Sequence, residues 1–341
     1  MKKINVAIVG CGSIAQTRHA PEYASNKNVA LYAFYDCVYE RAKNLADKYG
    51  GIAYACIDDL LNDKKIDAVS VCVANCFHAS VTIKALNAGK HVLCEKPMAL
   101  SVEECEDMIK AQEKSGKILM IAHDQRFDCA HIKAKEMLDN RAIGKVLTFK
   151  STFGHGGPEN WSVDKGTSNW FFNKQKTALG AMADLGVHKT DLLQYLLNDT
   201  VCEVYASFTT LDKKYPSEKP IDVEDNAICI FKTKGGVIGT LCASWTYYGE
   251  SDNSTTIYGS EGIAFIHKDP NFPLVIKKKS GEEIKFGKEI LRTNSGVIDS
   301  FINSITKDLP SSVDCKEVLW AIKVILGCEI SSSKNIPVRI K

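Results

Sequence analysis

A glycine-rich turn that directly follows the first apolar run constrains the fold of this chain more than any other feature. The run Ile4 to Val9 leads straight into Gly10-Cys11-Gly12-Ser13-Ile14-Ala15. Over the first third of the chain, further β-branched runs alternate with helical patterns, which is typical of βαβ units and a parallel sheet. We expect strands at Ile4 to Val9, Val29 to Asp36, Ala68 to Val73, His91 to Cys94 and Ile118 to Ala122.

The glycine turn has the context of a dinucleotide-binding motif, because it follows a strand and opens a helix. Gly10 permits the tight turn, Gly12 lets the backbone approach a pyrophosphate, and Ala15 allows close packing of the helix. Ser13 and Ile14 lie at the start of that helix, where backbone amides and the helix dipole favour phosphate binding. A glycine turn with a purely structural role is the alternative interpretation.

Asp36 ends the second expected strand, roughly 20 residues after the glycine motif. A carboxylate there accepts hydrogen bonds from the hydroxyls of the adenosine ribose and repels a 2′-phosphate. The next arginine is Arg41, on the following helix, so the sequence favours NAD over NADP as the cofactor. Asp36 can also act as a simple helix N-cap, and the two roles are compatible.

Two later turns reach the same edge of the expected sheet, which is where open α/β folds bind ligands. Asn75 and His78 follow one strand and are candidates for contact with the nicotinamide ribose. The next strand ends in Glu95-Lys96-Pro97, which places Glu95 beside the cofactor and delivers the Lys96 ammonium to one fixed point. A structural turn asparagine, a structural histidine and a solvated surface lysine are the alternatives.

Beyond residue 124 the pattern changes to longer strands separated by hairpin turns. We expect strands at Lys145 to Phe153, Val201 to Thr210, Ala227 to Thr233, Val237 to Thr246, Thr255 to Tyr258 and Ile263 to His267. Helices are expected at Val102 to Lys114, Asp128 to Asn140, Gly296 to Thr306 and Cys315 to Ser331. The fold class is therefore α/β: a doubly wound Rossmann domain over residues 1–124 and an α+β domain over residues 125–341, with a large, mostly antiparallel sheet.

Composition points to a small-molecule partner. Lys plus Arg number 43 and Asp plus Glu number 41, a net charge of +2, with no long block of like charge. Nucleic acids and anionic membranes need clustered cations, so neither is expected as a partner. No stretch approaches the roughly 18 apolar residues of a membrane span, and the Gly10 turn comes too early for a signal peptide. The 13 cysteines stand singly in apolar segments, which predicts a reducing, cytoplasmic location.

Asp184, His188 and Asp191 have the spacing of neighbours on one helix face. A carboxylate one turn away on either side can raise the basicity of an imidazole and fix its tautomer, which suits a general base near neutral pH. The alternatives are a satisfied core histidine and an Asp/His metal pair. Because no third convergent ligand is evident from the spacing, we expect no metal.

Four motifs together resemble the glucose-fructose oxidoreductase / inositol dehydrogenase / MocA (GFO/IDH/MocA) family, in order and spacing over essentially the whole chain. They are Gly10-Cys11-Gly12-Ser13-Ile14-Ala15, Cys94-Glu95-Lys96-Pro97, Arg126-Phe127 and Gly180-Ala181-Met182-Ala183-Asp184-Leu185-Gly186-Val187-His188-Lys189-Thr190-Asp191. The resemblance implies an NAD-binding domain followed by an open-faced sheet domain, usually associated into a homo-oligomer, a dimer or tetramer, through that sheet. It also implies oxidation of a secondary carbinol on a sugar or cyclitol.

The catalytic positions of the family match Lys96, Asp184 and His188. His188 would take the hydroxyl proton while the hydride passes to the nicotinamide, and Lys96 would offset the charge on the reacting oxygen. Asp184 would orient the pair. Two departures from the usual pattern, His123 and Asp124, lie near the substrate and leave its identity open.

Aromatic and polar residues between the long strand and the catalytic helix suit a sugar ring. Trp161 can stack on the ring, His155 is the favoured polar contact, and Arg126 is a weaker candidate; the alternative is that the aromatics anchor a loop. Only scattered lysines lie in this loop, which favours a neutral sugar or glycoside. Two other function classes fit the resemblance: a redox-neutral lyase or glycosidase that recycles NAD, and a non-catalytic NAD-sensing regulator, which need not keep Lys96 and His188.

Overall fold

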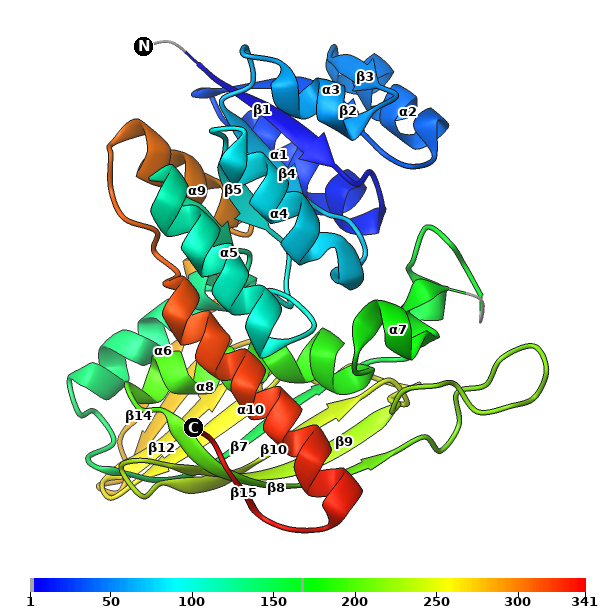
Figure 1. Ribbon diagram of the computed structural model, residues 1–341. Coiled ribbons are helices and arrows are strands. Elements are labelled where there is room, and N and C mark those ends of the chain that lie inside the picture. Colours follow the sequence, from blue (N-terminus) through cyan, green and yellow to red (C-terminus); the bar gives the residue numbers. More distant parts are fainter. Residues whose placement is uncertain (1–2, 167–168) are drawn as a thin grey trace.

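The computed structural model describes residues 3–166 and 169–341. These residues form two separate sheets, one near each end of the molecule in Figure 1, with helices packed around and between them. Residues 1 and 2, which begin the expected nucleotide domain, and residues 167 and 168, in the expected substrate loop, lie outside the described part of the chain. None of the described helices is both long and apolar enough to cross a membrane.

The first sheet is a parallel Rossmann sheet with the strand order β3-β2-β1-β4-β5-β6. Its strands are β1 (Ile4–Val9), β2 (Val29–Tyr35), β3 (Ile52–Tyr54), β4 (Ala68–Val71), β5 (His91–Cys94) and β6 (Leu119–Ile121). The expected α/β class and all five expected strands are confirmed. The sequence does not predict β3, which has only three residues and forms the edge of the sheet.

Helices cover both faces of this sheet. They are α1 (Ala20–Ser25), α2 (Tyr39–Tyr49), α3 (Ile57–Asn62), α4 (His78–Asn87) and α5 (Val102–Ser115). The expected cap of α5 is present, because Ser101 Oγ accepts a hydrogen bond from the Glu104 amide at 3.2 Å. The Glu104 carboxylate reaches back to the amide of Leu100 at 2.9 Å. A short helix with π geometry, η1 (Ala15–His19), precedes α1.

The second sheet has the order β14-β13-β12-β11-β7-β10-β9-β8-β15 within residues 3–166 and 169–341. Its strands are β7 (Val146–Gly154), β8 (Val201–Thr209), β9 (Asn226–Thr233), β10 (Ile238–Ser244), β11 (Thr255–Gly259), β12 (Gly262–Ile266), β13 (Leu274–Lys278), β14 (Glu283–Phe286) and β15 (Val338–Arg339). The expected, mostly antiparallel sheet is confirmed, and β7 and β10 form a parallel pair within it. The short outer strands β13, β14 and β15 were not foreseen.

Helices cover one face of the second sheet. Figure 1 shows α6 (Cys129–Asp139), α8 (Val187–Leu197) and α10 (Cys315–Lys334) between this sheet and the Rossmann domain, and no described helix on the opposite face. The short α7 (Lys174–Thr177) lies beside the turn after β4. By contrast, α9 (Val297–Thr306) packs next to the Rossmann domain, where Asn26 Nδ2 donates to Asp299 Oδ1 at 2.8 Å.

Gly10 lies where three strands of the Rossmann sheet converge. Its amide donates to the Tyr35 carbonyl at 2.8 Å, and its φ of +93° lies in the left-handed region. A Cβ atom at this position would lie 2.5 Å from the carbonyl carbon and oxygen of Cys72. The turn therefore requires glycine both for backbone conformation and for space.

We expect Gly10→Ala to lower the melting temperature more than Gly50→Ala does. Both glycines have a positive φ, but no atom lies within 4 Å of a Cβ at Gly50. Left-handed strain of about 1–3 kcal/mol is therefore common to both variants, and only Gly10→Ala adds the overlap with the Cys72 carbonyl. Equal losses in a thermal melt followed by circular dichroism would contradict this account.

Candidate active site

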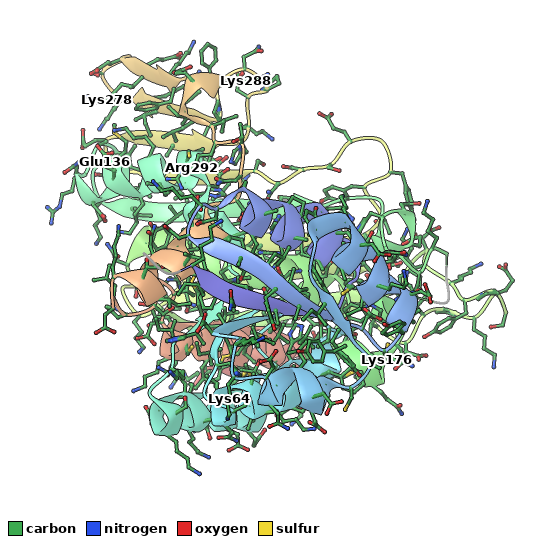
Figure 2. The ribbon with its side chains drawn as sticks, turned by 90° about the horizontal axis from the view of Figure 1, so that it is seen from above. Lys64, Glu136, Lys176, Lys278, Lys288 and Arg292 are labelled. Atoms are coloured by element: carbon green, nitrogen blue, oxygen red, sulfur yellow. The ribbon has the colours of Figure 1, made fainter. Side chains whose placement is uncertain are left out.

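A cavity of about 1160 Å³ opens at the carboxyl edge of the Rossmann sheet and extends to the helix-covered side of the second sheet. Its lining includes the glycine turn, the ends of β2, β4 and β5, and the start of α8. Arg292 and Lys176 both line it and lie on opposite sides of the Rossmann domain in Figure 2. The cavity is large enough for a dinucleotide together with a small substrate.

The glycine turn gives the cavity a phosphate-sized cradle. Gly10, Gly12, Ser13 and Ile14 all line it, as predicted. A Cβ on Gly12 would meet only Val163 Cγ2, at 3.7 Å, so the Gly12 backbone faces open space. These residues fit an NAD pyrophosphate, because exposed backbone at a helix start is what such a group requires.

Asp36 lies at the expected adenosine end of the cavity and is 8% exposed. Its carboxylate accepts hydrogen bonds from the amides of Cys11 at 2.7 Å and Val38 at 2.8 Å. Asp36 therefore ties the glycine turn to the end of β2. Oδ1 also accepts from the Cys37 thiol at 3.6 Å, whereas Oδ2 keeps a second lone pair that can accept from a ribose hydroxyl.

The turns after β4 and β5 are joined to each other by His78. Its Nδ1 lies 2.7 Å from the Pro97 carbonyl and its Nε2 lies 3.1 Å from the Val73 carbonyl. Both ring nitrogens face backbone carbonyls, so the imidazole fixes the two turns to each other, while His78 also lines the cavity and stays a candidate for contact with the cofactor. Asn75 likewise lines the cavity next to this turn and stays a candidate.

Glu95 lies beneath the cavity and is held by several groups. Its Oε1 lies 2.8 Å from His19 Nε2, and its Oε2 accepts from the Lys96 amide at 3.1 Å. Burial alone would raise the pKa of Glu95, but the hydrogen bond and charge of His19 outweigh it and lower the pKa to about 2. The carboxylate is therefore ionised and fixes the backbone of the catalytic turn.

A strap, defined here as residues 155–164, closes over the phosphate end of the cavity. Ser13 Oγ donates to the Trp161 carbonyl at 3.0 Å. The Arg41 guanidinium donates to Asp164 Oδ1 at 2.5 Å. These contacts join a segment of the second domain to the nucleotide motif, so a bound dinucleotide would be partly enclosed.

Lys96 and Asp184 form an ion pair between the two domains. Lys96 Nζ donates to Asp184 Oδ1 and to the Asp184 carbonyl, both at 2.9 Å. Trp245 Nε1 donates to the other carboxylate oxygen at 3.0 Å. Burial would raise the pKa of Asp184, but the Lys96 charge outweighs it and holds that pKa below its ordinary value.

His188 has a different partner from the one expected. Its Nδ1 lies 3.2 Å from Asp124 Oδ1, and Asp124 Oδ2 forms an ion pair with Arg18 at 2.8 Å. Burial would raise the pKa of Asp124, but the charges of His188 and Arg18 hold it well below its ordinary value. The pairing with Asp124 at Nδ1 leaves Nε2 as the ring nitrogen for the cavity.

The prediction that Asp184 and Asp191 flank His188 as partners is therefore wrong. The segment η6 (Met182–Gly186) has π geometry and ends in a hydrogen bond from the Val187 amide to the Met182 carbonyl. This wider turn changes the angle between Asp184 and His188 from that of a regular α-helix. Asp184 pairs with Lys96, and Asp191 pairs elsewhere.

Asp191 binds Arg126 instead. The guanidinium donates to both Asp191 oxygens at 2.7 Å and to Glu317 Oε2 at 2.7 Å. Arg126 is 7% exposed and does not line the cavity, so its assignment as a substrate contact is wrong. Each of its three nitrogens donates to a carboxylate, and these bonds join η3 (Asp124–Phe127) to α8 and α10.

His155 and Trp161, the expected substrate contacts, both line the cavity. His155 Nδ1 accepts from the Gly157 amide at 3.0 Å, which places the ring proton on Nε2, 3.9 Å from Asp184 Oδ2. Burial lowers the pKa of His155, so the ring is a neutral donor. Trp161 is 45% exposed and packs edge-on against Phe171 at 5.2 Å between ring centroids.

Two members of this site were missed as contributors from the sequence. The sequence marks Asp124 only as an unusual residue near the substrate, and no pattern in it singles out Arg18. Asp124 follows β6 and Arg18 lies in η1, so they meet only because their strands end at the same edge of the sheet. The only sequence feature that points to this pair is that Asp124 departs from the usual pattern of the family.

Comparison with known proteins agrees with this architecture. A family model described as an oxidoreductase family with an NAD-binding Rossmann fold matches residues 4–123, and a model of the GFO/IDH/MocA C-terminal domain matches residues 131–265. The chain is 26% identical to myo-inositol 2-dehydrogenase of Thermotoga maritima over 82% of this chain and 80% of that protein. It is 34% identical to D-glucoside 3-dehydrogenase of Escherichia coli over 57% of this chain and 54% of that protein.

Solved structures share the whole fold. An oxidoreductase domain protein from Kribbella flavida has a TM-score of 0.89 and 23% identity, with 100% of each chain covered. A levoglucosan dehydrogenase in complex with NADH and levoglucosan has a TM-score of 0.85 and 21% identity, also with 100% of each chain covered. Because the two family models match most of the chain and agree with both sheets, this chain belongs to the GFO/IDH/MocA family of oxidoreductases, whose N-terminal domain is an NAD-binding Rossmann fold.

Proposed function

We propose that this protein is an NAD-dependent dehydrogenase that oxidises a secondary carbinol of a sugar, glycoside or cyclitol. The observation that carries this proposal is that Lys96 and His188 line the same cavity as the nucleotide cradle. Each is held by its own carboxylate, at 2.9 Å and 3.2 Å respectively. A fixed ammonium and a fixed imidazole beside a hydride acceptor are what alcohol oxidation requires.

His188 is the general base in this mechanism. Its Nε2 takes the hydroxyl proton of the substrate, and the imidazolium that forms is stabilised by Asp124 at Nδ1. Arg18 holds Asp124 in place and ionised. When NAD is bound, its nicotinamide ring supplies the hydride acceptor.

Lys96 acts on the same substrate oxygen. Its ammonium has three donor positions, and two of them are used by Asp184. The third can donate to the reacting oxygen and offset the negative charge that develops as the proton leaves. Asp184 thus positions Lys96, while His155 and Trp161 offer a donor and an aromatic face to the rest of a sugar ring.

Relatives support a polyol-type substrate. The matching proteins include an inositol, a glucoside and a levoglucosan dehydrogenase, all of which are named for neutral cyclic polyhydroxy compounds. The cavity of this protein presents His155 and Trp161 on the substrate side, which agrees with such a ring. We propose NAD in preference to NADP because Asp36 would repel a 2′-phosphate.

A second candidate is a redox-neutral reaction in which NAD stays bound and is regenerated in each cycle. The strap favours this possibility, because Trp161 and Asp164 tie it across the nucleotide cradle. A closed strap slows nucleotide exchange. The two functions differ in whether NADH leaves the protein.

We further propose a domain boundary near residue 124, with α9 returning to pack on the N-terminal domain. The positions of the two family models, 4–123 and 131–265, support it. We propose a cytoplasmic location as well, because all 13 cysteines are free in the structure.

The uncovered face of the second sheet supports a homo-oligomer. It presents apolar side chains on neighbouring strands, among them Tyr205 at 38% exposure, Ile228 at 60%, Ile230 at 45% and Ile238 at 49%. Tyr205 lies opposite Ile230 across β8 and β9. Exposed apolar side chains on neighbouring strands are typical of an interface, and we propose that a second copy of the chain covers them.

The proposed function predicts that a neutral sugar, glycoside or cyclitol reduces free NAD in the presence of the protein. The measurement is a screen of such compounds, and of their phosphates as a contrast, with NADH absorbance as the readout. Stoichiometric NADH release supports the dehydrogenase. Product formation without a change in NADH absorbance would identify the redox-neutral reaction, and no turnover of any compound in the screen would count against both.

Lys96→Ala should lower turnover by about 100-fold or more, because it removes the charge that stabilises the reacting oxygen. NADH affinity should change by only a few fold, since the ammonium contacts Asp184 and the substrate. Lys64→Ala is the control, because Lys64 is a surface lysine outside the cavity. Near wild-type turnover for Lys96→Ala would make Lys96 structural.

His188→Asn should lower the oxidation rate by roughly 10² to 10⁴ and flatten the limb of the pH profile that rises with pH. Asp124→Asn should have a smaller effect on rate, because the imidazolium that forms at His188 loses its carboxylate partner. A substrate deuterium isotope effect must show that hydride transfer limits the rate. An unmoved limb in the folded His188→Asn protein would reject His188 as the base, and an unchanged rate for Asp124→Asn would reject Asp124 as its partner.

A further inference from the structure

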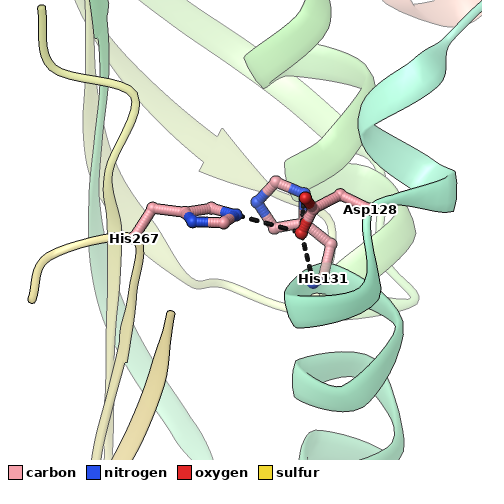
Figure 3. Close-up of side chains that lie close together, drawn as sticks. All are labelled: Asp128, His131 and His267. Carbon is pink, nitrogen blue, oxygen red and sulfur yellow. Dashed lines mark hydrogen bonds and ion pairs between the residues drawn. The ribbon is translucent and has the colours of Figure 1, made fainter. Parts of the chain in front are cut away.

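Three side chains with metal-binding chemistry meet at one end of the cavity and have no role in the proposed reaction. They are Asp128, which caps α6, His131 in the first turn of α6, and His267, which follows β12. One candidate ligand atom from each lies within 4.8 Å of the others, and all three residues line the cavity. Figure 3 shows His267 reaching from its own loop toward Asp128 and His131.

His131 has an unused lone pair in a buried position. The residue is 1% exposed, and its Nδ1 donates to the Gln125 carbonyl at 2.9 Å. The proton is therefore on Nδ1, and Nε2 is an acceptor that has no hydrogen-bond partner among the described residues. Histidine ligands of metal ions are commonly oriented in this way, with the second nitrogen donating to a carbonyl.

Asp128 keeps one carboxylate oxygen available. Its Oδ1 accepts from the amides of Ala130 and His131 and lies 3.0 Å from His267 Nε2. Within the described residues, Oδ2 accepts no hydrogen bond. A bound cation could therefore use Oδ2 while Oδ1 continues to cap the helix.

The neighbouring cation, Lys189, has acceptors of its own. Its Nζ donates to the Asn253 carbonyl at 2.9 Å and to Thr255 Oγ1 at 3.3 Å. Neither acceptor belongs to the cluster of Asp128, His131 and His267.

We propose that Asp128, His131 and His267 form a binding site for a divalent metal ion of the zinc class. Two imidazoles and one carboxylate suit Zn²⁺ and Co²⁺ better than Mg²⁺ or Ca²⁺, which prefer oxygen ligands. Three protein ligands leave a coordination position for water or for an oxygen atom of a molecule in the cavity. The site stands independently of the dehydrogenase reaction proposed above.

The test begins with the full-length protein after treatment with a chelator. Titration with Co²⁺ should give one equivalent of visible d–d absorbance, displaced by Zn²⁺ and unaffected by Mg²⁺. The cysteines of this chain can also bind such ions, so the ligand type must be read directly. X-ray absorption of the wild-type zinc complex should show nitrogen and oxygen neighbours without sulfur, and this measurement needs no variant.

Two variants remove a ligand while keeping its local backbone role. Asp128→Asn retains a helix-capping side chain, and His267→Asn suits the φ of +51° at that position, since asparagine tolerates the left-handed region. Each variant should weaken Co²⁺ binding by at least about 100-fold. Loss of a group that only hydrogen-bonds a metal ligand typically costs about 10- to 100-fold, so loss of the ligand itself should cost more. His91→Asn, outside the cavity, should bind Co²⁺ like the wild type.

Three results would overturn the proposal. They are the absence of Co²⁺ binding to the wild type at millimolar concentration, sulfur neighbours in the X-ray absorption spectrum, and unchanged affinity in both ligand variants with the fold intact by circular dichroism.

Discussion

The buried ion pair between Lys96 and Asp184 is the contact on which the site depends. Lys96 ends the turn after β5 of the Rossmann sheet, and Asp184 lies in η6 of the second domain. The two groups therefore reach these positions only when both domains are folded and docked. Removing either side chain would leave the other charge without its partner in a buried region, which is strongly destabilising. The same ion pair therefore joins the two domains and positions the catalytic lysine.

Each acidic group around the catalytic helix has its own cation. Asp184 binds Lys96, Asp124 binds Arg18 and faces His188, and Asp191 binds Arg126. This division keeps the carboxylates ionised in a buried region and leaves His188 one partner at Nδ1. Two turns with π geometry, η1 and η6, carry Arg18 and Asp184 into these pairs. Such turns are frequent at functional sites, where they re-aim a side chain within an otherwise regular helix.

The fold and the list of cavity residues could be predicted largely from the sequence, whereas the pairings could not. The glycine motif, the βαβ alternation and the Glu95-Lys96 turn depend on residues that are close in sequence. Such patterns can be recognised without knowing the tertiary structure. The pairing of His188 with Asp124 joins residues 64 positions apart in sequence, and helical spacing alone favoured Asp184 and Asp191. Arg126 was assigned to the substrate for the same reason, because its carboxylate partners come from two helices that are distant in sequence. Short edge strands such as β3 and β15 carry too few residues to show a period.

The cavity combines polar groups that are held by partners with buried polar atoms that lack them. Asp36, His78 and Glu95 are each bound by backbone or side-chain partners at the nucleotide end. His131 Nε2 is one of several buried side-chain atoms without a hydrogen-bond partner in the described part of the chain. Because native proteins rarely leave such atoms unpaired, this nitrogen supports the cation site proposed at Asp128, His131 and His267.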